Sequence, residues 1–258
     1  HGHSEKEAIT QYAGHTHAII YGPAMRSMLK ERQIDIETIY EVGNYRLDYY
    51  KRHVASYEPL VAELLDFPKK QPTLLYAPTW DDAEMSSSLT TEGEAVLETI
   101  PDSLNLVVKL HPLSLERQPA LTTHLIEKYS SSTQVRFITE FPPVYPLFPH
   151  VDAYLGDFSS VGYDFLSTGK PMFFLNHDGR REGRRLHECG IPLSSGREVT
   201  RIERLLEACS STTLRLKRQK LYNEAFTTPY EGLSTLRDEQ KGHRKGVSSQ
   251  QLESSRRE

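Results

Sequence analysis

The sequence predicts an α/β fold in which parallel strands are covered by helices on both faces. Short apolar runs alternate with segments of helical length along most of the chain. The runs 74–77, 104–110 and 172–175 are largely apolar, which is typical of parallel strands buried on both faces. Strands that alternate with helices are joined by right-handed crossovers, so we expect them to lie parallel in a sheet.

The first part of the chain is expected to hold short α/β elements. Strands are predicted at 18–21 and 39–42, and helices at 23–32, 45–57 and 59–67. The segment 68–72, Pro-Lys-Lys-Gln-Pro, is typical of a linker. We therefore expect a partial amino-terminal lobe at residues 1–67. The chain begins His-Gly-His-Ser without an initiating Met, and we expect it to be a piece of a longer protein.

A second lobe is expected at residues 68–237. Strands are predicted at 74–77, 104–110, 135–138, 153–155 and 172–175, and helices at 92–99, 115–129, after Ser160, and at 199–208 and 214–226. Residues 85–91 are polar and predicted to be loose. Residues 238–258 are charged, rich in Ser and Gln and without apolar periodicity, so we expect a disordered tail.

Composition excludes several classes of function. The chain has 258 residues, of which 37% are hydrophobic and 26% charged, and no apolar run approaches the ~20 residues of a membrane span. A formal charge of −4 argues against nucleic acid as a partner, because no basic excess is available to neutralise phosphates. The two cysteines, Cys189 and Cys209, form no metal or redox motif and favour a cytoplasmic location.

No cofactor or metal site is predicted. The chain lacks a Walker loop, GxGxxG, GxSxG and HExxH. His-x-His pairs occur at 1–3 and 15–17, but no cysteine or carboxylate cluster accompanies them at a suitable spacing. We therefore interpret both pairs as surface histidines on pattern alone.

Four polar clusters follow predicted strands, at the edge where ligands bind in open α/β sheets. They are Thr79 to Asp82, His111-Pro112, Glu140 to Pro143 and Asp157 to Ser160. Pro112 favours an extended His111, whose ring can contact a phosphate or transfer a proton. The alternative is a loop histidine that bonds a backbone carbonyl, and the pattern does not decide between them.

Ser159 and Ser160 lie between a predicted strand and a short helix. Their hydroxyls and the free N–H groups of the helix start can bind phosphate oxygens, although pattern alone favours simple helix caps. Asp164 falls on the same helix face as Ser160, either to accept from ligand hydroxyls or to complement the helix dipole. A basic loop at 180–185 either covers a phosphorylated ligand or is a solvated face.

Five motifs in order resemble the CDP-glycerol glycerophosphotransferases of teichoic acid synthesis. They are HGH at 1–3, GNYRLDYY at 43–50, LLYAPTW at 74–80, VVKLHP at 107–112 and DAYLGDFSSVGYDFLSTGKPMFFL at 152–175. The resemblance runs from His1 to about Phe226. It departs from the family at Asp81, where arginine is usual, and at His3, where Thr or Ser is usual.

The resemblance implies a GT-B-like fold, with helices on both faces of parallel sheets and a truncated amino-terminal, acceptor-side lobe. It implies transfer of a polyol phosphate from a CDP-activated donor to a lipid-linked or polysaccharide acceptor, with release of CMP. His1 corresponds to the general base and His111 to a second essential histidine. Thr79, Ser159, Ser160 and Asp164 correspond to donor-binding positions, with the serines near the pyrophosphate and Asp164 near the glycerol.

The resemblance also implies a cytoplasmic enzyme that is peripheral on the inner face of the membrane. Two alternatives remain open. One is a related GT-B enzyme that uses a nucleotide-sugar, such as a glycosyltransferase or a UDP-sugar epimerase. The other is a non-catalytic nucleotide-binding fragment.

Overall fold

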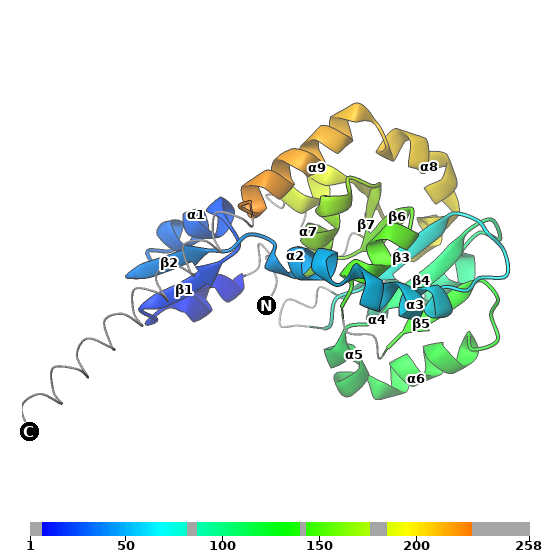
Figure 1. Ribbon diagram of the computed structural model, residues 1–258. Helices are drawn as coiled ribbons and strands as arrows, with labels where there is room; N and C mark the ends of the chain where they lie inside the picture. The colour runs from blue at the N-terminus through cyan, green and yellow to red at the C-terminus, as the bar shows by residue number, and fades with distance from the viewer. Residues whose placement is uncertain (1–6, 82–86, 140–142, 176–184, 229–258) are drawn as a thin grey trace, which may run out of the picture. The chain divides into compact units, whose positions relative to one another are not determined.

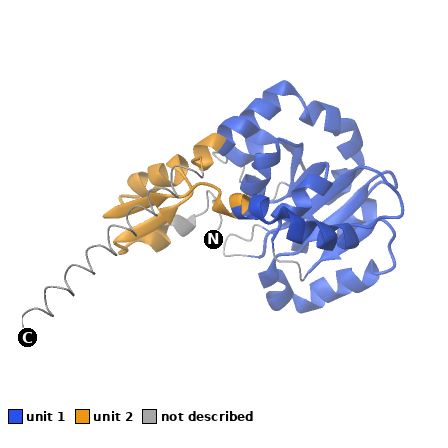
Figure 2. Ribbon diagram, in the orientation of Figure 1, with its two compact units in different colours: residues 1–5, 49–222 blue, residues 6–48, 223–258 orange. Residues whose placement is uncertain are grey.

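The computed structural model describes residues 7–81, 87–139, 143–175 and 185–228 (Figure 1). Two compact units make up this part of the chain (Figure 2). The larger runs from Tyr49 to Tyr222, and the smaller contains the residues up to Asp48 together with those from Asn223 onwards. The smaller unit is therefore built from segments that are far apart in the sequence.

The smaller unit contains a parallel pair of strands, β1 (His17–Ile20) and β2 (Thr38–Glu41), joined by helix α1 (Pro23–Glu31) and preceded by the 3-10 helix η1 (Glu7–Tyr12). Each predicted strand is found, shifted by one residue. The chain returns to this unit near its end, where Thr227 donates a backbone hydrogen bond to the carbonyl of Tyr21 at 3.0 Å. The Phe226 ring packs edge-on against Tyr21 at 5.8 Å between centroids, so these residues close the small core.

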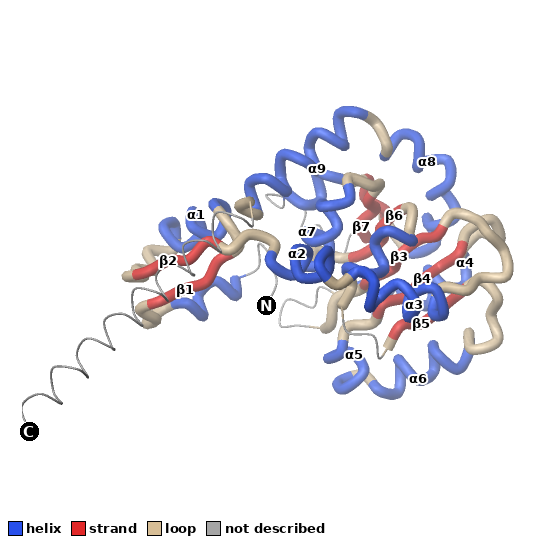
Figure 3. Tube along the Cα trace, in the orientation of Figure 1, coloured by secondary structure: helices blue, strands red, loops and turns tan. Residues whose placement is uncertain are grey.

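The larger unit is built on a sheet whose strands lie in the order β5-β4-β3-β6-β7-β8. Strands β5, β4, β3, β6 and β7 of this sheet can be followed in Figure 3. Every neighbouring pair in the sheet is parallel. The strands are β3 (Thr73–Ala77), β4 (Asn105–Lys109), β5 (Val135–Ile138), β6 (Ala153–Gly156), β7 (Met172–Leu175) and β8 (Ile191–Leu193). The first five were predicted, whereas β8 was missed because Pro192 interrupts a short apolar run.

Helices α2 to α9 and four 3-10 helices accompany this sheet. Their bounds are α2 (Tyr45–Arg52), α3 (Val54–Leu64), α4 (Ser88–Thr99), α5 (Pro112–Arg117), α6 (Pro119–Lys128), η2 (Tyr145–His150), α7 (Ser160–Phe165), η3 (Leu166–Thr168), η4 (Arg185–Cys189), η5 (Gly196–Arg201), α8 (Ile202–Cys209) and α9 (Thr212–Ala225). Parallel strands covered by helices are the fold class that the sequence predicts.

Two predicted helices are broken in the structure. The helix expected at 115–129 is divided into α5 and α6 at Gln118, whose φ of −129° and ψ of 49° lie outside the helical region. Pro119 follows and disfavours the helical conformation of the residue before it. The helix expected at 45–57 ends at Arg52, and α3 then runs through Pro59 to Leu64.

Helix α4 begins earlier than the sequence predicts. Residues 88–91, expected to be loose, form its first turn because the Ser87 hydroxyl caps the helix by accepting a hydrogen bond from Leu89 N–H at 3.2 Å. The remainder of that expected loose segment, 85–86, lies outside the described residues, as does the predicted tail at 238–258.

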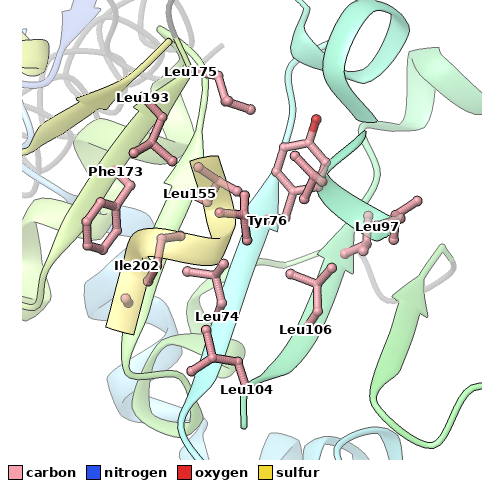
Figure 4. Close-up of a cluster of buried hydrophobic side chains, with 14 of the residues drawn as sticks. Leu74, Tyr76, Leu97, Leu104, Leu106, Leu155, Phe173, Leu175, Leu193 and Ile202 are labelled. Atoms are coloured by element: carbon pink, nitrogen blue, oxygen red, sulfur yellow. The ribbon is translucent and has the colours of Figure 1, made fainter. Parts of the chain in front are cut away.

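One face of the large sheet carries the main hydrophobic core. Figure 4 shows Leu74, Tyr76, Leu106 and Leu155 among the buried side chains of this cluster. Successive residues of a strand point to opposite faces, so Leu75, Lys109 and Tyr154 belong to the other face. That face packs on aromatic rings, with the Tyr154 and Phe165 centroids 5.3 Å apart.

Helix α3 belongs to the larger unit and lies before the predicted lobe boundary at 67/68. It packs against η2, where Glu58 and His150 approach to 3.4 Å. The boundary between compact units falls between Asp48 and Tyr49, within helix α2. The assignment of an acceptor-side lobe and a donor-side lobe remains a prediction.

Candidate functional site

Three of the polar clusters meet at the carboxyl edge of the large sheet. Strands β4, β3 and β6 are neighbours, with Tyr76 paired to Val108 and Ala77 paired to Gly156. Because these strands are parallel, the residues that follow them emerge at the same edge. Thr79, His111 and Ser159 therefore belong to one region of the larger unit.

The carboxylate of Asp157 joins two segments of this edge. Its Oδ2 accepts hydrogen bonds from the backbone N–H of Thr79 at 2.8 Å and of Ser88 at 3.0 Å. The Ser87 hydroxyl donates to the Thr79 carbonyl at 2.7 Å. Thr79 is itself buried, at 7% exposure. These hydrogen bonds attach Thr79 both to the segment after β6 and to the start of α4.

Ser159 occupies the N-cap position of α7, but its side chain makes no capping hydrogen bond. Its hydroxyl lies instead 3.4 Å from the hydroxyl of Tyr154. The interpretation of Ser159 as a simple helix cap is therefore wrong. Ser160, the first residue of the helix, is half-buried at the same edge. Both hydroxyls lie at the carboxyl end of β6.

Asp164 lies on the second turn of the same short helix and is buried, at 1% exposure. Tyr154 is fully buried beside the two acids of this region. Burial raises the pKa of the Tyr154 phenol, and the charges of Asp157 and Asp164 raise that pKa further. The phenol therefore stays protonated at neutral pH and is available as a hydrogen-bond donor near Ser159.

His111 adopts the extended conformation that the following proline favours, with φ −72° and ψ 137°. Its Nδ1 accepts a hydrogen bond from the backbone N–H of Leu113 at 3.1 Å, so the ring caps helix α5. The alternative considered from the sequence was a ring that bonds a backbone carbonyl. In the structure the ring instead accepts a hydrogen bond from a backbone N–H. A neutral ring whose Nδ1 accepts carries its proton on Nε2, so His111 presents Nε2–H as a donor.

An aromatic and a cationic side chain accompany His111. The Trp80 ring lies 6.3 Å from the His111 ring, and the Arg117 guanidinium lies 4.6 Å from the centre of the Trp80 ring. A guanidinium over an indole is an attractive cation–π arrangement. Arg117 was not predicted as a site residue, because no motif and no apolar periodicity in the sequence distinguishes it.

Several predicted site residues lie outside the described part of the chain. They are His1, Asp82, the cluster members at 140–142 and the basic-loop residues at 180–184. Arg185 is exposed and belongs to η4. Within the described residues, no group of three or more His, Cys, Asp or Glu side chains could hold a metal ion. In the same part of the chain, no helix combines the length and apolar character that crossing a membrane requires.

Comparison with known proteins supports the resemblance seen in the motifs. The family profile of CDP-glycerol:poly(glycerophosphate) glycerophosphotransferase matches residues 3–185, which include Thr79, His111, Ser159, Ser160 and Asp164. A teichoic acid glycerol-phosphate primase of Bacillus subtilis is 29% identical over 119 residues, covering 46% of this chain and 29% of that protein. A teichoic acid glycerol-phosphate transferase of Staphylococcus aureus is 25% identical over 150 residues, covering 55% and 36%.

Solved structures agree with the fold class. The wall teichoic acid polymerase TagF matches with a TM-score of 0.64 and 17% identity, over 89% of this chain and 59% of that one. A UDP-GlcNAc 2-epimerase of Methanocaldococcus jannaschii matches with a TM-score of 0.57 and 16% identity, over 88% and 61%. The fold is thus the GT-B-like arrangement that the motifs imply.

The chain spans about a third of the length of these two curated relatives. The family profile nevertheless covers well over half of the chain and includes most of the large sheet. The chain belongs to the CDP-glycerol:poly(glycerophosphate) glycerophosphotransferase family.

Proposed function

We propose that the chain carries the donor side of an active site that transfers glycerol phosphate, or a related polyol phosphate, from a CDP-activated donor to an acceptor hydroxyl. The observation that carries this proposal is the family match over residues 3–185, which contain the polar edge of the large sheet. In the reaction, the acceptor oxygen bonds to the β-phosphorus, the bond from that phosphorus to the bridging oxygen breaks, and CMP leaves.

The donor diphosphate is assigned to the carboxyl end of β6. The hydroxyls of Ser159 and Ser160 lie there, and the Ser159 hydroxyl is not used to cap the helix. Hydroxyl donors stabilise the charge that develops on phosphate oxygens during transfer. Thr79 forms the neighbouring wall, held by Asp157. Asp164 is buried, so we assign it to the floor of the site, on the side of the polyol.

The two histidines receive different roles. His111 presents Nε2–H because its Nδ1 accepts from Leu113 N–H, so it suits donation to a phosphate oxygen better than removal of a proton. The acceptor hydroxyl needs a general base, and we assign that role to His1, because its HGH segment resembles the family's first motif; His1 itself lies just before residues 3–185, which the family profile matches. The acceptor is proposed to be lipid-linked or a cell-surface polymer, reached from the cytoplasmic face of the membrane by peripheral association.

A donor screen tests the function. The chain is incubated with CDP-glycerol, CDP-ribitol or UDP-sugars in the presence of a lipid-linked acceptor, and released nucleotide is separated by chromatography. CMP release from a CDP-polyol that depends on the acceptor supports the proposal. Turnover of UDP-sugars alone overturns it and favours a nucleotide-sugar enzyme of the same fold. Binding of CDP without transfer by the longer protein that contains this chain favours the non-catalytic alternative.

A further inference from the structure

Lys109 is a buried cation at the carboxyl end of β4. The residue is 7% exposed, and its ammonium group lies 3.4 Å from the carbonyl oxygen of Leu110. An ammonium group has three N–H donors, and 3.4 Å is long for a hydrogen bond to oxygen. Within the described ranges, this is the single hydrogen bond of the Lys109 side chain, and no carboxylate there forms an ion pair with it.

Two other cations of the larger unit show how this fold satisfies a structural charge. The Lys170 ammonium donates to the carbonyls of Phe148 at 2.8 Å, Pro149 at 3.1 Å and Val151 at 2.6 Å. The Arg218 guanidinium donates to three carbonyls, between 3.0 and 3.1 Å. The Lys170 ammonium thus has one carbonyl for each of its three N–H donors, and Nε, Nη1 and Nη2 of Arg218 each donate to one carbonyl. Lys109 differs, because its charge is buried without comparable compensation from the described residues.

Burial of an uncompensated charge is unfavourable, since the ammonium loses its hydration. Consistent with this, burial lowers the pKa of the Lys109 ammonium, and no charged group of the described residues offsets the effect. A lysine whose ammonium is buried at this energetic cost is expected at a site where a bound ligand supplies the missing hydrogen-bond acceptors.

The position of Lys109 points to the ligand. Val108 pairs with Tyr76, so Lys109 lies beside Ala77, and Ala77 pairs with Gly156 on the next strand. These three positions share the sheet face that carries Tyr154, opposite the main core. Neighbouring strands lie roughly 4.8 Å apart, which places the Lys109 backbone about 10 Å from the end of β6.

The two positions between Lys109 and the proposed donor site carry almost no side chain. A Cβ added at Gly156 would lie 2.3 Å from the Tyr154 hydroxyl, which in turn lies 3.4 Å from the Ser159 hydroxyl. The small side chains of Ala77 and Gly156 therefore leave the face between Lys109 and Ser159 to backbone atoms and the Tyr154 hydroxyl. The group that fills the space beside Gly156 is thus a hydroxyl, so the stretch from Lys109 to Ser159 presents a polar group and not an apolar side chain.

We propose that Lys109 is a further donor-binding residue, whose ammonium donates to a phosphate oxygen of the CDP-polyol diphosphate. This inference rests on the proposed function and adds a residue to it. A diphosphate supplies both the negative charge and the oxygen acceptors that the buried ammonium lacks, and N⁺–H···O⁻ bonds of this kind are strong. The same contact stabilises the negative charge of the leaving CMP.

The test compares Lys109→Met with Lys170→Met, which removes a cation whose acceptors are all backbone carbonyls. CDP-glycerol and CDP are titrated into each variant and the unsubstituted chain by calorimetry, and each melting temperature is measured without ligand. We expect Lys109→Met to raise the Kd of both ligands about 10- to 100-fold, the value of one charge-assisted hydrogen bond. Lys170→Met is expected to lower the melting temperature and leave Kd within twofold.

Other outcomes are equally decisive. An unchanged Kd in Lys109→Met, with or without a loss of stability, assigns the ammonium to the fold and overturns the inference while leaving the proposed function standing. If Lys109→Met does not fold, Lys109→Gln replaces it, and failure of both to fold also overturns the inference. If the unsubstituted chain binds neither CDP-glycerol nor CDP, the proposed donor site and this inference are both overturned.

Discussion

The carboxylate of Asp157 accepts a hydrogen bond from the backbone N–H of Thr79 at 2.8 Å, across 78 positions of sequence. The bond joins the segment after β6 to the segment after β3, and Ser88 N–H donates to the same oxygen at 3.0 Å. Thr79, the wall of the proposed donor site, is thus fixed to the segment that carries Ser159 and Ser160. A site held in this way loses little conformational entropy when the donor binds.

We expect Asp157→Ala to lower the free energy of unfolding by about 2–4 kcal/mol, because two backbone N–H groups lose their acceptor. Urea denaturation measures the change. Asp157→Asn retains an acceptor oxygen and is expected to recover more than half of the loss. Asp102→Ala, at an exposed position on the opposite edge, is the control and should be near neutral. Equal stability of Asp157→Ala and Asp102→Ala would contradict the prediction.

Arg218 is expected to be a major source of stability in the larger unit. It is 1% exposed and donates to the carbonyls of Gly169, Cys189 and Cys209, which belong to three different segments. Arg218→Met should lower the free energy of unfolding by about 3–5 kcal/mol, since charge-assisted bonds are lost and buried carbonyls are left without a donor. Arg218→Lys should recover only part of the loss, because an ammonium cannot reproduce the planar fork.

Arg215→Ala is the matched control for that measurement. Arg215 lies on the same helix, α9, but is exposed. Its replacement is expected to change the free energy of unfolding by less than about 0.5 kcal/mol. If Arg215→Ala lowers the free energy of unfolding as much as Arg218→Met does, the loss comes from any change of charge on α9, and the prediction for Arg218 is contradicted.

Much of the fold can be predicted because the strands are apolar on both faces. The strands predicted at 135–138 and 172–175 have the bounds that the structure gives β5 and β7. Runs such as Met172 to Leu175 have no polar residue, and a flanking Gly-Lys-Pro marks where the chain turns. The carboxyl-edge position of Thr79, His111 and Ser159 follows directly from that pattern.

Other features depend on long-range contacts that the sequence does not reveal. The Asp157–Thr79 bond joins residues that no local pattern relates. Lys109 lies within an apolar run, where a single lysine gives no sign of whether its ammonium is paired. The side chain of Ser159 has the position and the chemistry of a helix cap, yet it contacts Tyr154 instead, and this choice is made by packing on the sheet.

The two cysteines are expected to be unreactive in the folded chain. Cys189 is 2% and Cys209 0% exposed, and burial raises the pKa of both thiols, that of Cys189 to about 11. A raised thiol pKa means less thiolate, roughly 0.1% at pH 8 for a pKa of 11. Titration with Ellman's reagent should detect neither thiol in native buffer and both in guanidinium chloride. Rapid release of the chromophore in native buffer would contradict the prediction.

His111 combines a structural and a proposed chemical role, and the two can be separated. Its Nδ1 caps α5 through Leu113 N–H, and its Nε2–H is proposed to donate to the phosphate. Asparagine is a good N-cap, so His111→Asn should keep the free energy of unfolding within about 0.5 kcal/mol, while His111→Ala should lower it by about 1–2 kcal/mol. Both variants lose the imidazole and should reduce CMP release about 10²- to 10⁴-fold. His124→Asn, at an exposed position of α6, is the control and should retain turnover. If His111→Asn retains turnover, His111 acts only as a cap, and transfer relies on the remaining groups of the edge.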